Sequence, residues 1–198
     1  IRTIDADLTN ILVYKEYVNA AYAQFGKKIN KFSLLIGLRM EDSNIVIDQR
    51  TTNDYTNKRY TNWFPTVNLS FEIDEKESIT LGYAKRIRRP RGFFLNPFPS
   101  RNSITNFFQG NPDLDPASTG SFDFGYLKRF KKFTLNGSIY YQRTTNNFQF
   151  VNEDTGETVV LSGDPNDPNS DLVIVPVLRR GPINLSKNKR YGGEASLT

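Results

Sequence analysis

Segments in which apolar and polar residues alternate recur along this sequence, and the connections between them are in turn short and long. A period of two is typical of β-strands whose two faces meet different surroundings. The segments lie at residues 32–42, 63–73, 79–86, 121–130, 133–143 and 190–197, and residues 13–25 form a seventh that could also be read as helical. We therefore expect an all-β protein with about seven strands.

The segment 63–73 shows the pattern clearly. One face carries Trp63, Pro65, Val67, Leu69, Phe71 and Ile73, and the other carries Phe64, Thr66, Asn68, Ser70 and Glu72. A soluble β-sandwich, in which one face of each sheet is wet, produces the same alternation as a membrane barrel. The alternation alone therefore leaves both architectures open.

The lengths of the connections favour the barrel. Residues 26–31, 74–77 and 131–132 are short, charged turns, whereas the other connections run from about Asp48 to Tyr60, Arg88 to Thr119 and Asn152 to Lys189. Transmembrane barrels have tight periplasmic turns at one end and long extracellular loops at the other. Globular domains seldom contain such long unstructured connections. We expect an antiparallel up-and-down segment of a large transmembrane β-barrel.

The composition excludes several kinds of chemistry. The chain has no cysteine and no histidine, which excludes thiolate nucleophiles, imidazole bases, His-ligated metals and disulfides. The net charge of +5 is small against 26 basic and 21 acidic residues, so we expect no nucleic acid as a partner. Aromatic residues make up 13% of the chain, which suits strands and membrane interfaces. We expect no enzymatic activity, no cofactor and no metal site.

Two acidic loops could hold a cation. "GNPDLDP" (110–116) offers Asp113 and Asp115, which fall short of the roughly six to eight oxygen ligands that calcium takes. We prefer a rigid corner here, because Pro112 and Pro116 restrict the residues before them to extended geometry. "SGDPNDPNSD" (162–171) lacks the glycine and the closing glutamate of an EF-hand, and we interpret it as a solvated loop.

The densest basic cluster is "RIRRPRGFF" (86–94), which also contains aromatic residues. Nucleic-acid contacts, binding of anionic lipopolysaccharide, contacts to an anionic solute and structural ion pairs all remain open for such a cluster. We favour ion pairs at the rim of the barrel, because Glu41, Glu72 and Asp123 fall on the polar faces of nearby strands and need partners.

Four stretches, residues 17–44, 60–98, 108–141 and 182–198, resemble the C-terminal barrel of TonB-dependent outer-membrane receptors, in the branch that carries the outer-membrane-protein β-barrel domain. The resemblance runs over nearly the whole chain and is weakest at residues 152–179. It implies part of a barrel of about 22 strands in the bacterial outer membrane. It also implies energised uptake of a scarce extracellular solute, with outer-membrane lipid, the rest of the barrel, a plug domain and TonB as partners.

On this interpretation residues 1–198 form a single barrel fragment. The sequence shows no plug domain, TonB-contacting segment or signal peptide, so transport by this chain alone is not expected. The residues expected to contact the solute lie in the long loop and are Arg88, Arg89, Arg91, Phe93, Phe94 and Asn96.

Two other functions remain open at this point. A soluble β-sandwich that binds a ligand of the carbohydrate type would pack the apolar faces of its sheets against each other. A passive, porin-like barrel would need no plug and would carry a charged loop folded inward.

Overall fold

The computed structural model describes residues 9–101, 103–163, 165–167 and 170–198, which form one sheet of nine strands and a short helix. Two strands, β5 (Ser100–Arg101) and β6 (Asn106–Phe108), are short, and the helix α1 spans Gly92–Leu95. The long strands are β1 (Leu12–Ile29), β2 (Phe32–Gln49), β3 (Asp54–Asp74), β4 (Glu77–Arg88), β7 (Ala117–Arg129), β8 (Thr134–Ser162) and β9 (Val173–Leu197). Across the described residues, no helix has the length and apolar character needed to cross a membrane.

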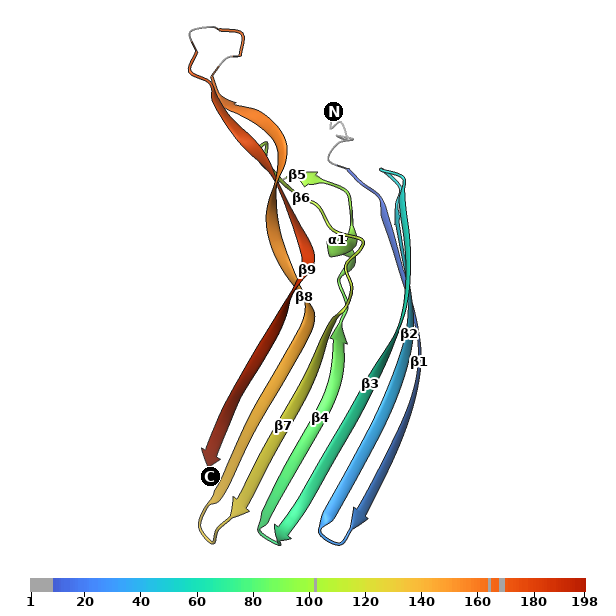
Figure 1. Cartoon of the computed structure of the whole chain (residues 1–198), viewed down its shortest axis with the longest axis vertical. Helices are drawn as coiled ribbons and strands as arrows, with labels where there is room; N and C mark the ends of the chain where they lie inside the picture. Colours follow the sequence, from blue (N-terminus) through green and yellow to red (C-terminus); the bar gives the residue numbers. More distant parts are fainter. Residues whose placement is uncertain (1–8, 102, 164, 168–169) are drawn as a thin grey trace, which may run out of the picture.

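The seven long strands follow one another across the sheet in chain order, and β6 and β5 lie beyond β9. Each neighbouring pair of long strands is antiparallel, whereas β6 runs parallel to β9. The sheet curls into a trough, and three tight turns lie together at its lower end (Figure 1). The expected up-and-down arrangement of about seven strands, with short turns at one end, is confirmed.

The other end of the sheet corrects two of the three predicted loops. The connection expected at residues 48–60 is a turn of residues 50–53, because β2 continues to Gln49 and β3 begins at Asp54. Most of the connection expected at residues 152–189 belongs to β8 and β9, which form a twisted hairpin above the sheet (Figure 1). The upper part of the β8–β9 hairpin is exposed over most of its length, so the sequence there shows little alternation although the backbone still pairs. The upper end of β2 is different, because every second residue from Ser43 to Gln49 is buried on the concave face.

Each face of the sheet has its own chemistry, because residues opposite one another in antiparallel strands share a face. One row of the apolar face reads Phe25, Ile36, Val67, Tyr83, Phe122, Tyr141 and Tyr191 across the long strands. The neighbouring row of the other face reads Gln24, Gly37, Thr66, Ala84, Ser121, Gln142 and Arg190. The chain thus builds a wall with an apolar face and a polar face.

The apolar face is exposed. Ile139, near its middle, is 62% exposed, and Trp63 is 50% exposed. The aromatic pairs Phe32–Phe71 and Phe130–Phe133, with ring centroids 4.5 and 4.3 Å apart, lie near the tight turns. The β-sandwich alternative is wrong, because the described strands form a single sheet whose apolar face has no second sheet against it.

A small core lies on the polar face near the long-loop end. Ile45 and Ile47 of β2 pack against Leu95 and Leu114, which belong to the connection between β4 and β7. We call this connection, residues 89–116, the inner loop. It crosses the trough between β1–β3 and β8–β9 (Figure 1), so the polar face is the concave side of the sheet.

Candidate functional site

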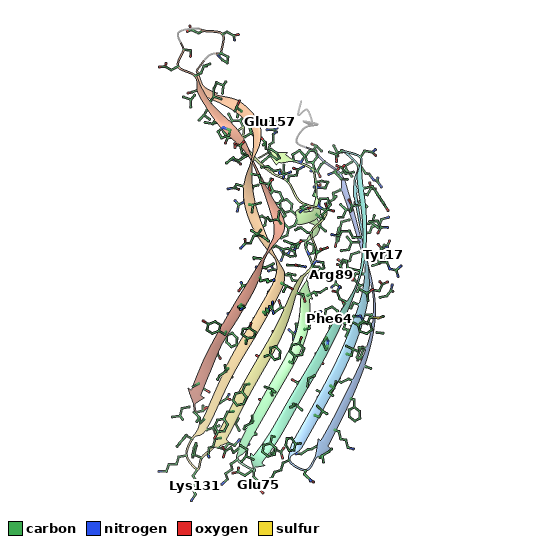
Figure 2. All side chains as sticks on the ribbon, in the orientation of Figure 1. Tyr17, Phe64, Glu75, Arg89, Lys131 and Glu157 are labelled. Atoms are coloured by element: carbon green, nitrogen blue, oxygen red, sulfur yellow. The ribbon has the colours of Figure 1, made fainter. Side chains whose placement is uncertain are left out.

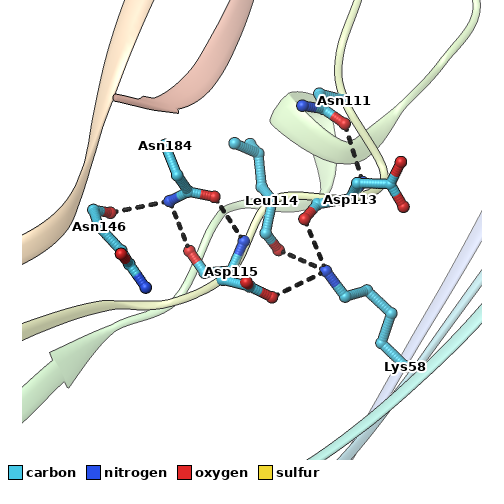
Figure 3. A network of polar contacts seen from close by, with 7 residues as sticks. All are labelled: Lys58, Asn111, Asp113, Leu114, Asp115, Asn146 and Asn184. Atoms are coloured by element: carbon cyan, nitrogen blue, oxygen red, sulfur yellow. Dashed lines mark hydrogen bonds and ion pairs between the residues drawn. The ribbon is translucent and has the colours of Figure 1, made fainter. Parts of the chain in front are cut away.

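The inner loop is held by a corner of hydrogen bonds at its C-terminal end. The ammonium of Lys58, on β3, donates to the carbonyl oxygens of Asp113 and Leu114 at 2.8 and 3.0 Å and reaches the Asp115 carboxylate at 3.1 Å. On the other side, the amide of Asp115 donates to Asn184 Oδ1 at 2.7 Å, and Asn184 Nδ2 donates to the carbonyl oxygens of Asp115 and Asn146 at 3.0 and 2.8 Å (Figure 3). The corner therefore ties β3 to β8 and β9.

This network bears out the structural interpretation of "GNPDLDP". Asn111 Oδ1 accepts a hydrogen bond from the Asp113 amide at 2.9 Å (Figure 3), which forms the turn expected of an Asn before proline. The Asp115 carboxylate faces the Lys58 ammonium rather than a second carboxylate. No group of three or more acidic side chains that could hold a metal ion is found in the part of the chain that the structure describes. The acidic loop at 162–171 includes residues 164, 168 and 169, which lie outside the described residues.

Asn96 anchors the N-terminal part of the inner loop. Its Oδ1 accepts hydrogen bonds from Gln49 Nε2 at 2.9 Å and from the Phe98 amide at 3.1 Å. Its Nδ2 donates to Asn10 Oδ1 at 3.1 Å, which also accepts from Gln49. Gln49 is fully buried on β2, so the hydrogen bonds among Asn96, Gln49 and Asn10 hold the inner loop against the sheet. The contacts of Asn96 are those of a structural residue.

Arg89 sits among acids of the polar face. Its guanidinium contacts Glu41 at 2.5 Å, Glu16 at 3.2 Å and the Ser43 hydroxyl at 3.0 Å. Glu41 also pairs with Arg39 at 2.7 Å. The predicted pairing between the basic cluster and an acid of the strands is confirmed for Glu41, whereas Glu72 pairs with Lys28 of β1.

The same neighbourhood affects a nearby tyrosine. Tyr14 donates a hydrogen bond from its hydroxyl to Glu16 at 2.9 Å. Burial, followed by this hydrogen bond to a carboxylate, raises the pKa of the Tyr14 hydroxyl well above its usual range. Tyr14 is therefore a neutral donor that holds Glu16 in place for Arg89.

A hollow of about 550 Å³ opens beside Arg89. It lies where the ladder between β3 and β4 ends, at Thr66 and Ala84. Figure 2 shows Arg89 and Phe64 at this seam. Its lining combines aromatic, cationic and small residues, among them Tyr22, Phe64, Arg39, Arg86, Arg89 and Gly37. Such a mixture suits a solute that carries both apolar and anionic parts.

A cluster of aromatic rings lies above the hollow, between the inner loop and β8. Phe93 stacks on Phe108 at 4.6 Å between ring centroids, and Phe150 lies 5.3 Å from Phe94 and 6.2 Å from Phe108. The guanidinium of Arg180 lies 5.6 Å from the centre of the Phe150 ring. Phe93 is 59% exposed, so the cluster presents an open aromatic surface.

The six residues predicted to contact a solute occupy different surroundings. Phe93 and Phe94 belong to the aromatic cluster, and Arg88 lies 5.0 Å above the ring of Phe148 and donates to Asn147 at 2.8 Å. Arg89 borders the hollow, Asn96 is engaged in anchoring, and Arg91 is exposed. Sequence reasoning missed Phe108 of the inner loop and Phe148 and Phe150 of β8. The contacts of Phe148 and Phe150 with the inner loop depend on pairing between distant segments, and Phe108 is positioned where β6 pairs with β9.

Comparison with known protein families gives a match over the whole chain. A model of the outer membrane protein beta-barrel family matches residues 1–198. A search among curated proteins finds no match.

Several solved structures share this fold. A double mutant of the Serratia marcescens hemophore receptor HasR, in complex with its hemophore HasA and heme, is 15% identical, with a TM-score of 0.64 over 92% of this chain and 31% of that one. The FrpB iron transporter from Neisseria meningitidis (F5-1 variant) is 14% identical, with a TM-score of 0.58 over 93% and 24%. The siderophore receptor PirA from Pseudomonas aeruginosa is 12% identical, with a TM-score of 0.55 over 95% and 40%. The chain thus spans between about a quarter and two fifths of the length of these proteins.

Proposed function

This chain belongs to the outer membrane protein beta-barrel family, and from that premise we propose that it forms part of the wall and loops of a TonB-dependent receptor that takes up a scarce solute. The observation that supports this proposal most strongly is the position of the inner loop on the concave side of the sheet. The loop lines the concave side of an outer-membrane wall with an aromatic cluster and a cationic hollow. The three similar structures are named as receptors or a transporter, which supports the same class.

Further strands complete the wall in this proposal. Within the described residues, one edge of β1 has no partner, and neither has the edge of β9 beyond Arg180. An unpaired edge is not stable in lipid, because water is absent there and each free amide or carbonyl group carries a large cost. The remainder of a receptor barrel satisfies both edges, a plug domain fills its lumen, and TonB acts through that plug.

Solute capture would begin at the aromatic cluster. Phe93 offers an exposed ring for stacking, and Arg88 and Arg180 place positive charge close to the same rings. The hollow at the seam of β3 and β4 lies deeper, with Arg86 and Arg89 on its border. We assign the first contact to the cluster and the second to the hollow. An anionic chelate with aromatic groups fits both.

Uptake measurements test this proposal. The full natural chain is expressed in a bacterium that lacks its own receptors, and the uptake of labelled ferric siderophores and heme is measured with and without a protonophore. We expect uptake of one solute that stops with the protonophore. Phe93→Ala should raise its apparent KM about tenfold, since stacking on one ring contributes about 1–3 kcal/mol. Phe133→Ala, at the short-turn end, is the control and should leave KM unchanged.

A passive pore is the second candidate, because the inner loop is charged and folds onto the concave side, which is the feature expected of a porin-like barrel. Planar bilayers distinguish the two functions. A steady ion current through the full natural chain, together with solute flux that survives the protonophore, would contradict the receptor proposal and support a passive pore.

A further inference from the structure

Three cations share one row on the apolar face of the wall. Lys85 of β4 lies opposite Gly120 of β7, Gly120 lies opposite Arg143 of β8, and Arg143 lies opposite Lys189 of β9. Opposite residues share a face, so the three side chains leave the sheet on the same side. We call them the outer cation row.

The outer cation row borders the apolar band. The next row on the same face toward the tight turns is Tyr83, Phe122, Tyr141 and Tyr191, and the rings of Tyr83 and Phe122 are 4.7 Å apart. Tyrosine is enriched at the boundary between the hydrocarbon and the headgroups of a bilayer. Two residues further along each strand, the three cations reach the level of the headgroups.

The outer cation row has no internal counter-ion in an ion pair among the described residues, since no ion pair there includes Lys85, Arg143 or Lys189. On the same face of β2 and β3, by contrast, Arg59 pairs with Asp42 at 2.7 Å. Arg143 and Lys189 lie directly opposite each other, and like charges in that position destabilise a sheet. An anion from outside the chain would relieve this repulsion.

The centre of the row also holds a neutral donor. Gly120 has no side chain, and the Tyr83 hydroxyl oxygen lies 3.6 Å from the place where a Cβ at Gly120 would be. The hydroxyl therefore lies between Lys85 and Arg143, where it can donate a hydrogen bond to an oxygen bound by both cations.

We propose that Lys85, Arg143 and Lys189 bind the phosphate groups of an anionic lipid in the leaflet at the long-loop end of the wall. Phosphate oxygens complement ammonium and guanidinium groups, and the aromatic row beneath would pack against the acyl chains of the same lipid. The three side chains leave the sheet on the convex side, although Lys85 also borders the hollow at the seam of β3 and β4. The lipid site is argued from the outer cation row alone and does not depend on the proposed solute.

Lipid titration of the full natural chain tests this site. The purified protein in a neutral detergent is titrated with lipid A, with phosphatidylcholine and with inorganic phosphate, and bound lipid is counted by native mass spectrometry. We expect lipid A to bind and to survive a large excess of inorganic phosphate, while phosphatidylcholine binds weakly. Binding that inorganic phosphate abolishes, or equal binding of both lipids, would overturn a lipid site.

Adjacent residues provide matched variants, because neighbours on a strand point to opposite faces. Lys85→Gln with Lys189→Gln should weaken lipid A binding about tenfold or more. Arg86→Gln with Arg190→Gln removes the same charge from the same strands on the concave side and should leave lipid binding within about twofold. Lys85→Arg with Lys189→Arg should retain binding. Equal losses in the convex and concave pairs would overturn the proposal, and heat-dependent gel mobility checks that each variant is folded.

Discussion

At the scale of a single residue, Gly110 shows why the inner loop needs a glycine where it crosses its own N-terminal part. A Cβ at this position would lie 2.5 Å from the carbonyl oxygen of Asn96 and 2.7 Å from that of Phe94. The Gly110 and Asn111 amides donate to these two carbonyl oxygens at 2.8 and 2.7 Å. The obstacle is therefore backbone, which cannot rotate away as a side chain can.

Gly110→Ala should lower the free energy of unfolding by about 2–3 kcal/mol. The added methyl group would push residues 110–111 away from residues 94–96 and break both backbone hydrogen bonds between them. Urea unfolding in detergent micelles, followed by tryptophan fluorescence, measures this change. The control is Gly137→Ala, whose methyl group would meet nothing closer than 3.9 Å. A similar stability for both variants would contradict the tight crossing.

Arg89 shows how one predicted residue can have two roles. It neutralises Glu16 and Glu41 on the wall and also borders the hollow. Its charge is thus largely satisfied within the chain, whereas Arg86 borders the same hollow and is exposed. The densest basic stretch of the sequence therefore divides into residues engaged in ion pairs, such as Arg89, and exposed residues at the border of the hollow, such as Arg86.

At the scale of elements, the inner loop is a packed segment with fixed ends. Leu95 and Leu114 place apolar side chains on Ile45 and Ile47, and Lys58 fixes the corner from the side of β3. The upper parts of β1–β3 separate from β4 above Thr66, and the loop connects the two parts on the concave side. This connection explains why the core lies at the long-loop end.

Lys58→Met should loosen this corner, because the carbonyl oxygens of Asp113 and Leu114 lose their ammonium donor. The cost should be about 1–3 kcal/mol for the groups left unpaired. Hydrogen exchange measured by mass spectrometry should speed up at residues 111–116 and stay unchanged at residues 30–31. Lys132→Met, on the short turn between β7 and β8, is the control. Unchanged exchange at the corner would show that the apolar contacts alone hold it.

At the scale of the whole molecule, the chain has far more wall than core. Its buried apolar residues are few, and large apolar side chains lie exposed over the convex face of the long strands. In water such a surface would drive aggregation. In a bilayer it is the surface that lipid solvates, which accords with membership of an outer-membrane family.

Ile139→Arg should destabilise the folded barrel by about 2–4 kcal/mol, because it places a charge in the middle of the lipid-facing band. Reversible unfolding of the full natural chain in phospholipid vesicles measures this cost. Asn136→Arg is the matched control, since Asn136 lies on the concave face of the same strand, opposite Leu127 and Ser196. If both variants lose the same stability, the convex face does not meet lipid.

Periodicity and the three short charged turns predicted an up-and-down antiparallel wall, its seven long strands and its tight turns, whereas two of the three long connections were predicted wrongly. These features are local, because a strand with one face in lipid must alternate along its own length. The upper ends of β8 and β9 were missed because they are largely exposed, which weakens the alternation. The upper ends of β2 and β3 were missed because Ser43, Ile45, Ile47 and Gln49 are buried against the inner loop and not against lipid, and that packing cannot be read from the strand itself.

The tertiary structure alone decided which residues of the inner loop are anchors and which are open. Asn96 meets Gln49, Arg89 meets Glu41, and Phe94 meets Phe150 only after distant segments have paired. Such contacts depend on the register between strands and on the curl of the sheet. Both are properties of the assembled wall, because each strand fixes the position of the next.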